Sequence, residues 1–113
     1  MILHIVARSD WPAAEVTAPS LVSEGFVHCS DPGTVHLPAN RLYAGRTDLV
    51  LLEIDPALVG VPVRWEAAVP AIEAGPWFPH VYGPIPAAAV VGVHDFPPGP
   101  DGLFELPASL GSR

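Results

Sequence analysis

The alternation of apolar and polar positions divides the chain into short elements bounded by proline and glycine. Apolar runs predict strands at 2–6, 25–29, 49–54, 61–65 and 90–96, and a short extended piece at 80–82. Helices are predicted from Ser9 or Asp10 to about Thr17 and from Asp31 to Gly45, because each starts at a capping side chain followed by proline. Single helical turns are predicted at 55–58 and 86–88, whereas 67–74 fits neither pattern. Most connections are too short for repeated parallel crossovers, so we expect an α+β fold.

Two of the predicted strands also indicate which side chains share a face. The run 49–54 reads Leu-Val-Leu-Leu-Glu-Ile, which is apolar nearly throughout and predicts a strand buried on both faces. Within 25–29, period-two alternation places Phe26 and His28 on one face and Val27 and Cys29 on the other. Cys29 is therefore expected to pack as a small apolar side chain.

Three histidines interrupt apolar runs: His4, His28 and His80. Burying a polar ring without a partner costs roughly 2 kcal/mol or more, so each needs a physical reason. We predict that the three rings converge on one pocket. The alternative for each is a core histidine that donates to a backbone carbonyl.

Length, charge and cysteine content limit the possible domain organisation, ligands and cellular location. With 113 residues we expect one domain over 1–96, followed by a Pro/Gly-rich tail over 97–113 that docks in part. The formal net charge of −7 argues against binding a nucleic-acid backbone, and the chain has no lysine for a Schiff base or a P-loop. A single cysteine and the absence of a signal peptide or a membrane-length apolar run predict a cytoplasmic protein.

Several motifs resemble the DUF952 family, small bacterial proteins of unassigned function, over about residues 1–96. The motifs, in the family's order, are Met1-Ile2-Leu3-His4-Ile5, Glu24-Gly25-Phe26-Val27-His28-Cys29-Ser30, Asn40-Arg41, Asp48 to Pro56, Val63-Arg64-Trp65-Glu66, and Phe78-Pro79-His80-Val81-Tyr82-Gly83-Pro84-Ile85-Pro86. The resemblance implies an ADP-ribosyltransferase-like fold: two small, mostly antiparallel sheets around a cleft that holds NAD as substrate, with two short flanking helices.

The same resemblance implies roles for particular residues. His4 matches the N-terminal-strand position near the nicotinamide-side ribose, and Ser30 loosely matches the hydroxyl position on a second strand. The late glutamate motif, Gln-x-Glu or Glu-x-Glu, is absent, and Glu66 or Glu53 would have to substitute for it. Fold analogy by itself carries no activity.

The residues themselves suggest further site candidates. His28 and His80 suit acid–base chemistry near neutral pH. Tyr82 lies two residues after His80 in an extended segment and points the same way. Arg64 and Glu66 alternate onto one strand face, where they form either an anion clamp beside a carboxylate or a cross-strand ion pair.

Arg41 beside Asn40 is either a phosphate contact or part of a solvated helix face. We therefore expect a nucleotide-type ligand in the cleft, and the protein would be a transferase or a relic of one. The expected catalytic residues are His28, His80 and Glu66, and the expected ligand-binding residues are His4, Ser30, Arg41, Arg64 and Tyr82.

Two other functions stay open. One is a non-catalytic interaction module with a protein partner. The other is a metal-dependent hydrolase in which three histidines and Glu66 form a zinc site, although no bound metal is expected.

Overall fold

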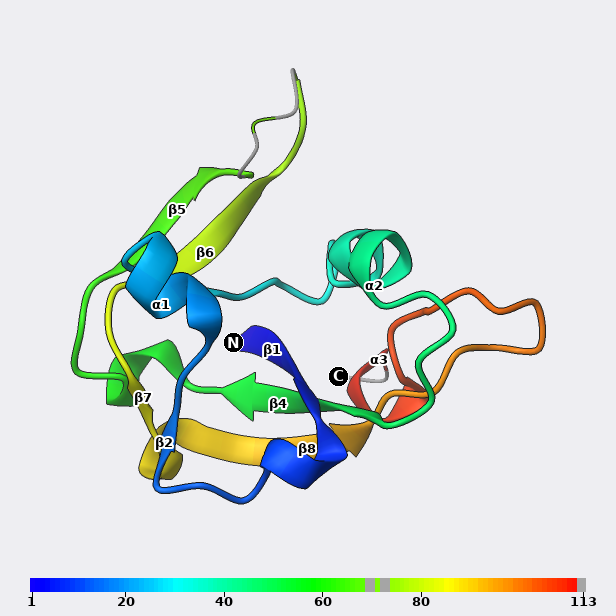
Figure 1. The fold of residues 1–113 in the computed structure, drawn as a ribbon, viewed down its shortest axis with the longest axis horizontal. Coiled ribbons are helices and arrows are strands. Elements are labelled where there is room, and N and C mark those ends of the chain that lie inside the picture. The colour runs from blue at the N-terminus through cyan, green and yellow to red at the C-terminus, as the bar shows by residue number, and fades with distance from the viewer. Residues whose placement is uncertain (69–70, 72–73, 112–113) are drawn as a thin grey trace.

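The structure, a computed structural model, describes residues 1–68, 71 and 74–111. Its central sheet has the order β1-β4-β8, formed by β1 (Ile2–Ala7), β4 (Leu49–Ile54) and β8 (Val90–Asp95), all antiparallel. A second sheet has the order β3-β6-β5, formed by β3 (Val27–His28), β6 (Trp77–Val81) and β5 (Val63–Ala67). Figure 1 shows β5 and β6 rising away from the central sheet.

The α+β class is confirmed, but the expected number of sheets is wrong. The described residues form a third, two-stranded sheet from β2 (Glu15–Val16) and β7 (Ile85–Pro86). Its formation also overturns the helix predicted from Ser9 or Asp10 to Thr17. Val16 is instead extended, pairs with Ile85 and is buried in the core.

β4 is the strand around which the core is organised, as its sequence predicts. Its neighbours β1 and β8 pair with it on both edges, and all six of its residues are buried. Alternate side chains enter two separate apolar clusters, because successive residues of a strand face opposite ways. Val50, Leu52 and Ile54 pack with β3 and β6, whereas Leu49 and Leu51 pack with α2 and the C-terminal tail.

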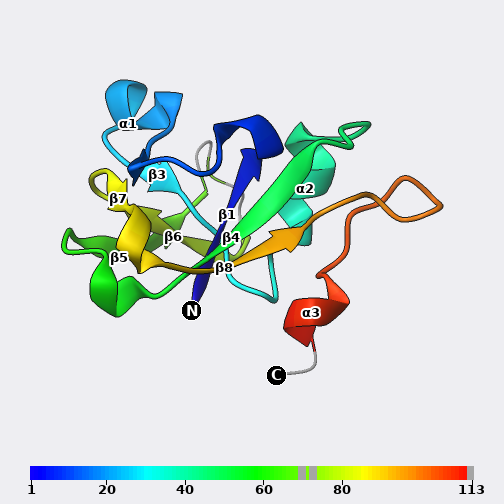
Figure 2. The same ribbon diagram turned by 90° about the horizontal axis from the view of Figure 1, so that it is seen from below.

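Helices are short and lie outside the sheets (Figure 2). α1 (Pro19–Ser23) begins at a proline, because the first turn of a helix tolerates a residue without an N–H. α2 (His36–Leu42) begins five residues later than predicted. Before it, Asp31 closes a turn by accepting from the Thr34 hydroxyl at 2.8 Å. Gly45 follows α2 with a φ of +84°, a conformation that suits glycine after a helix end.

The remaining predicted elements are found with shifted bounds. Asp55 caps the turn at Pro56–Leu58 by accepting from the Ala57 N–H at 2.9 Å, and a second turn spans Ala87–Ala89. β5 starts two residues later than predicted, and β6 extends well before the predicted piece at 80–82. The run 67–74, for which no element was predicted, lies partly outside the described residues.

The tail after residue 96 packs back on the body. Phe104 is buried beside Phe96, with ring centroids 5.0 Å apart, and α3 (Ala108–Gly111) buries Leu110. Ser109 of the same helix contacts His94, with 2.7 Å between its Oγ and Nδ1 of the ring.

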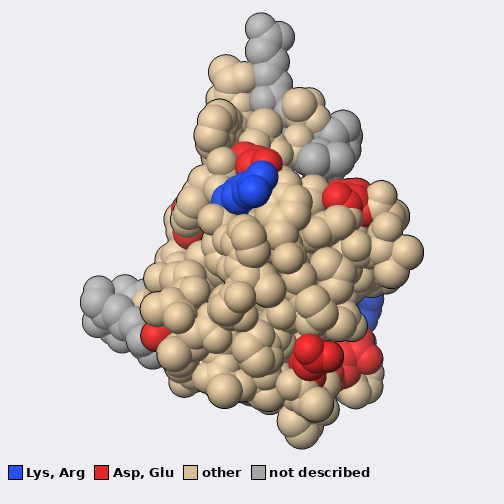
Figure 3. Space-filling view, turned by 90° about the vertical axis from the view of Figure 1, so that its left-hand side faces the viewer, with Lys and Arg blue, Asp and Glu red and all other residues tan. Residues whose placement is uncertain are grey.

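Charged groups are sparse on the face that carries β5 and α1 (Figure 3). Among the described residues, no helix combines the length and the apolar character that crossing a bilayer would require.

Candidate functional site

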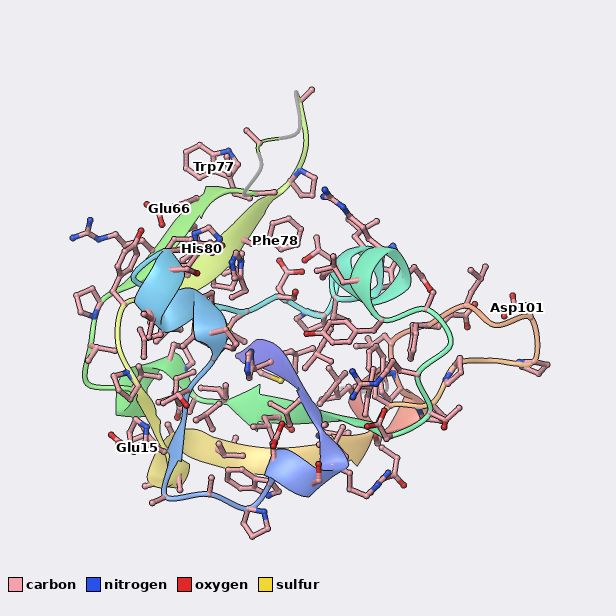
Figure 4. All side chains as sticks on the ribbon, viewed as in Figure 1. Glu15, Glu66, Trp77, Phe78, His80 and Asp101 are labelled. Atoms are coloured by element: carbon pink, nitrogen blue, oxygen red, sulfur yellow. The ribbon has the colours of Figure 1, made fainter. Side chains whose placement is uncertain are left out.

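A cleft of about 690 Å³ opens between α1, α2 and the strands β1, β3 and β6. That volume lies within the usual range for small-molecule sites. In Figure 4, Phe78 points from β6 across the cleft toward α2. The polar and charged side chains that line it are His4, Ser20, Glu24, His28, Ser30, Arg41, Tyr43 and His80, and the other lining residues are Leu3, Ile5, Ala18, Pro19, Cys29, Leu37, Pro38, Leu42, Ala68, Pro76 and Phe78.

All three histidines singled out from the sequence line this cleft. His28 of β3 lies directly opposite His80 of β6 in the antiparallel register, and the two ring centroids are 5.3 Å apart at 77°. His4 reaches the same place from β1, where its Nδ1–H donates to the backbone oxygen of His28 at 2.7 Å. Three segments far apart in the sequence therefore contribute imidazoles to one hollow.

The position of β1 beside β3 depends on a backbone bridge. Leu3 and Ser30 exchange two N–H···O bonds, each 2.7 Å long. Ser30 is consequently buried at the end of the β3 segment while still lining the cleft.

Burial is the main reason that the pKa of His4 is lowered from its ordinary value of 6.5, so the neutral ring is favoured.

The His80 ring is held by an aromatic stacking contact and by a contact with a carboxylate. Its ring stacks on Phe26, with centroids 4.0 Å apart and planes 15° apart. Its Nδ1 lies 3.0 Å from Oε1 of Glu66 on β5, and the same oxygen accepts from the Tyr82 hydroxyl at 2.5 Å. Figure 4 shows Glu66 beside His80 on the neighbouring strand.

The Glu66 hydrogen bonds also shift two pKa values. The bond from Tyr82, followed by the bond from His80, lowers the pKa of Glu66, so its carboxylate form is favoured. Donating that bond raises the pKa of Tyr82, since the phenolate would lose it. The chain thus places an ionised carboxylate against the imidazole but outside the residues that line the cleft.

Glu24 is a cleft residue that the sequence analysis missed. Its Oε2 lies 2.8 Å from His28 Nε2. Gly25, with a φ of +89°, turns the chain sharply between α1 and β3, which brings the two side chains together. Glu24 belongs to the same sequence motif as His28. Because the two residues do not lie on one helix, their spacing in the sequence does not predict that the side chains meet.

The two candidate arginines separate in the structure. Arg41, exposed on α2, lines the cleft. Arg64 does not, and its guanidinium carbon lies 5.1 Å from the centroid of the Tyr82 ring. Neither Glu53 nor Glu66 lines the cleft. Glu53 instead lies 2.9 Å from Nε2 of His94.

Cys29 lines the cleft and is 4% exposed. Burial raises the pKa of its thiol to about 12, so it is a poor nucleophile. Within 1–68, 71 and 74–111 no group of three or more histidine, cysteine or acidic side chains is placed to hold a metal ion. One nitrogen of each of these histidines is engaged: His4 contacts a backbone oxygen, and His28 and His80 contact two different carboxylates.

These features define a small α+β protein with antiparallel sheets whose histidines meet in one cleft. A family model described as "Protein of unknown function (DUF952)" matches residues 5–93, and the chain belongs to this family.

Solved structures of one relative are similar to the chain throughout. A crystal structure of the protein CC0527 from Caulobacter crescentus is 28% identical, with a TM-score of 0.78 and 93% of each chain covered. A solution NMR structure of CC0527 from the same organism is 26% identical, with a TM-score of 0.75, covering 99% of this chain and 97% of that one. A comparison with curated proteins finds no match.

Proposed function

We propose that the cleft binds a nucleotide-type small molecule and that His28 and His80 transfer protons to or from it. The convergence of His4, His28 and His80 in one hollow of about 690 Å³ carries the proposal. Titratable rings beside an apolar wall are the usual composition of a site that both binds and reacts.

The lining suggests how such a ligand would lie. A flat base would pack against Phe78 and the apolar residues of α2, and a phosphate would meet Arg41. Among the described residues that line the cleft, Arg41 is the single arginine, while Glu24 adds a carboxylate beside His28. A ligand with one phosphate suits this charge balance better than a ligand with several. We therefore expect AMP to bind more tightly than ADP-ribose or NAD.

The finer fold assignment belongs to the same proposal. The cleft lies between β1 of the central sheet and β3 and β6 of the second sheet, which supports the ADP-ribosyltransferase-like arrangement that the family resemblance implies. In a glycosyl or ADP-ribosyl transfer, an acceptor hydroxyl would lose its proton to an imidazole. Its oxygen would form the new bond to the anomeric carbon as the bond to the leaving base breaks. We place this activity in the cytoplasm, where the free thiol of Cys29 is stable.

Calorimetric titration with AMP, ADP-ribose and NAD tests the proposal. Arg41→Gln should weaken binding of the phosphate-bearing ligands by about 10-fold, the size expected for one charge-assisted contact. Arg64→Gln is the matched control, because Arg64 is also exposed to solvent but does not line the cleft. If no heat of binding is detected with any of these ligands at millimolar concentration, the proposal is wrong.

A non-catalytic interaction module is the alternative, and one observation favours it. Val22, Leu42 and Trp77 are large apolar side chains that are mostly exposed, and Leu42 lines the cleft. A protein partner that covers them would remain bound when His28 and His80 are both replaced by alanine. A nucleotide whose binding depends on those histidines favours the enzyme.

A further inference from the structure

We infer that Glu66 and Tyr82 fix one tautomer of His80, and that this tautomer requires a hydrogen-bond donor from the ligand group seated beside it. The chemical class that fits this end of the cleft is a hydroxyl or an amide N–H, not a phosphate or carboxylate oxygen. The second half rests on the proposed function, since it needs a ligand in the cleft, whereas the tautomer is a property of the free protein.

The tautomer follows from what Glu66 is able to do. An ionised carboxylate accepts hydrogen bonds and donates none. Because Glu66 Oε1 lies 3.0 Å from His80 Nδ1 and also accepts from the Tyr82 hydroxyl, the proton of the neutral imidazole resides on Nδ1. Nε2 then carries the lone pair and is an acceptor.

The ring is unable to reverse these roles by rotating. Its stacking on Phe26 and the edge contact of His28 hold its plane from two sides. A half-turn would place a ring carbon against the carboxylate and break a bond whose imidazole side is shielded from water, since His80 is 1% exposed. Glu66 and Tyr82 are therefore positioning residues that act through His80.

The acceptor that remains is unpaired. Within the part of the chain that the structure describes, Nε2 of His80 is buried and has no hydrogen-bond partner. His80 itself lines the cleft, while Glu66, on the other ring nitrogen, does not. The lone pair of Nε2 thus points away from Glu66, and a donor group of the ligand would satisfy it.

Discrimination follows from the cost of leaving that acceptor unpaired. A ligand group without an O–H or N–H leaves the buried Nε2 unpaired, so it binds about 10- to 100-fold more weakly than a matched group that donates. An anionic group is disfavoured further, because two acceptors would face each other near the Glu66 charge. In the proposed nucleotide, a ribose hydroxyl or an amide group would lie at His80 and the phosphate at Arg41.

The first experiment measures the tautomer in the ligand-free protein. Two-dimensional ¹H–¹⁵N correlation spectra of the histidine rings at pH 8 should show a protonated Nδ1 and a bare Nε2 for His80. In Glu66→Gln the amide is able to donate or to accept, so a mixture of tautomers is expected. A proton on Nε2 in the wild type, or an unchanged tautomer in Glu66→Gln, overturns the inference. Glu66 would then serve only to join β5 to β6.

The second experiment measures the preference for a donor with fragments that are not nucleotides. Phenol, anisole and benzoate share an aromatic ring and present a hydroxyl, an ether and an anion. Titrations that follow the His80 ring signals should show phenol binding about 10-fold tighter than anisole and benzoate, and the preference should shrink in Glu66→Gln. Equal affinities, or no response of His80 to phenol, overturn the inference. If the nucleotides do not bind but phenol binds as expected, the proposed function is wrong and the inference about His80 is supported.

Discussion

Glu53 of β4 lies directly opposite Gly92 of β8, and the space of the missing Gly92 side chain is occupied by the Glu53 carboxylate. A Cβ atom built at Gly92 would lie 2.6 Å from Oε1 of Glu53 and 3.1 Å from Nε2 of His94. Glycine at this position thus leaves room for the 2.9 Å contact between the two side chains.

Gly92→Ala should destabilise the protein by about 1 to 3 kcal/mol, because the added methyl group forces the buried Glu53 carboxylate away from the half-buried His94 ring. Urea unfolding measures this free energy. Gly33→Ala is the control, since its Cβ would meet its nearest atom at 3.4 Å in an exposed turn, and we expect a change below about 0.5 kcal/mol. Equal effects of the two substitutions would show that the Glu53–His94 contact does not depend on this glycine.

The pH dependence of stability should reveal the buried neutral ring of His4. Its folded pKa lies below the ordinary 6.5, so the unfolded chain binds more protons in the window between the two values. The stability that neutral His4 contributes is therefore fully present above pH 6.5 and is lost as the pH falls below it.

His4→Gln keeps a donor for the His28 carbonyl but does not titrate. The unfolding free energy of the wild type minus that of His4→Gln should fall between pH 7.5 and pH 5.5, with a slope of at most about 1.4 kcal/mol per pH unit. Taking the difference cancels the other histidines, three of which contact carboxylates or a hydroxyl. A difference that grows toward low pH contradicts the assigned direction.

The thiol of Cys29 should be inert in the folded protein. Its pKa of about 12 against an ordinary value of 9.0 leaves about 1000-fold less thiolate at pH 8. An aromatic disulfide reagent should therefore label native protein at least 100-fold more slowly than protein unfolded in guanidinium. Cys29→Ser gives the blank. Complete labelling of native protein within seconds would place a reactive nucleophile in the cleft.

The sequence predicts those features of the fold that depend on neighbouring residues, but not those that depend on contacts between residues far apart in the chain. The strand Leu49–Ile54 and the shared face of Phe26 and His28 follow from local patterns, and both are found. Val16 was misassigned because its extended conformation depends on pairing with Ile85, far along the chain. Local capping signals favoured a helix there, and tertiary pairing outweighs them.

The same limit applies to the candidate site. Convergence of three histidines was predictable because each one interrupts an apolar run and needs a partner. Their actual partners were not, since Glu24 reaches His28 only through the turn at Gly25, and the His94–Glu53 contact joins residues 41 positions apart. Sequence patterns identify the buried polar groups here, and only the fold pairs them.

Docking of the tail is a test of whether residues 1–96 form a complete folding unit. Asn40 of α2 donates to the Phe104 carbonyl at 3.2 Å and accepts from the Phe104 N–H at 2.7 Å, while the Phe104 ring packs on Phe96. Phe104→Ala should cost about 3 to 5 kcal/mol, a large part of the total for a domain of this size. The neighbouring Leu103→Ala is the control, because Leu103 is 53% exposed whereas Phe104 is 1% exposed. Thermal unfolding followed by circular dichroism should show a clear loss for the first variant and little for the second. If both variants melt like the wild type, the segment after residue 96 adds nothing to the stability of the core it covers.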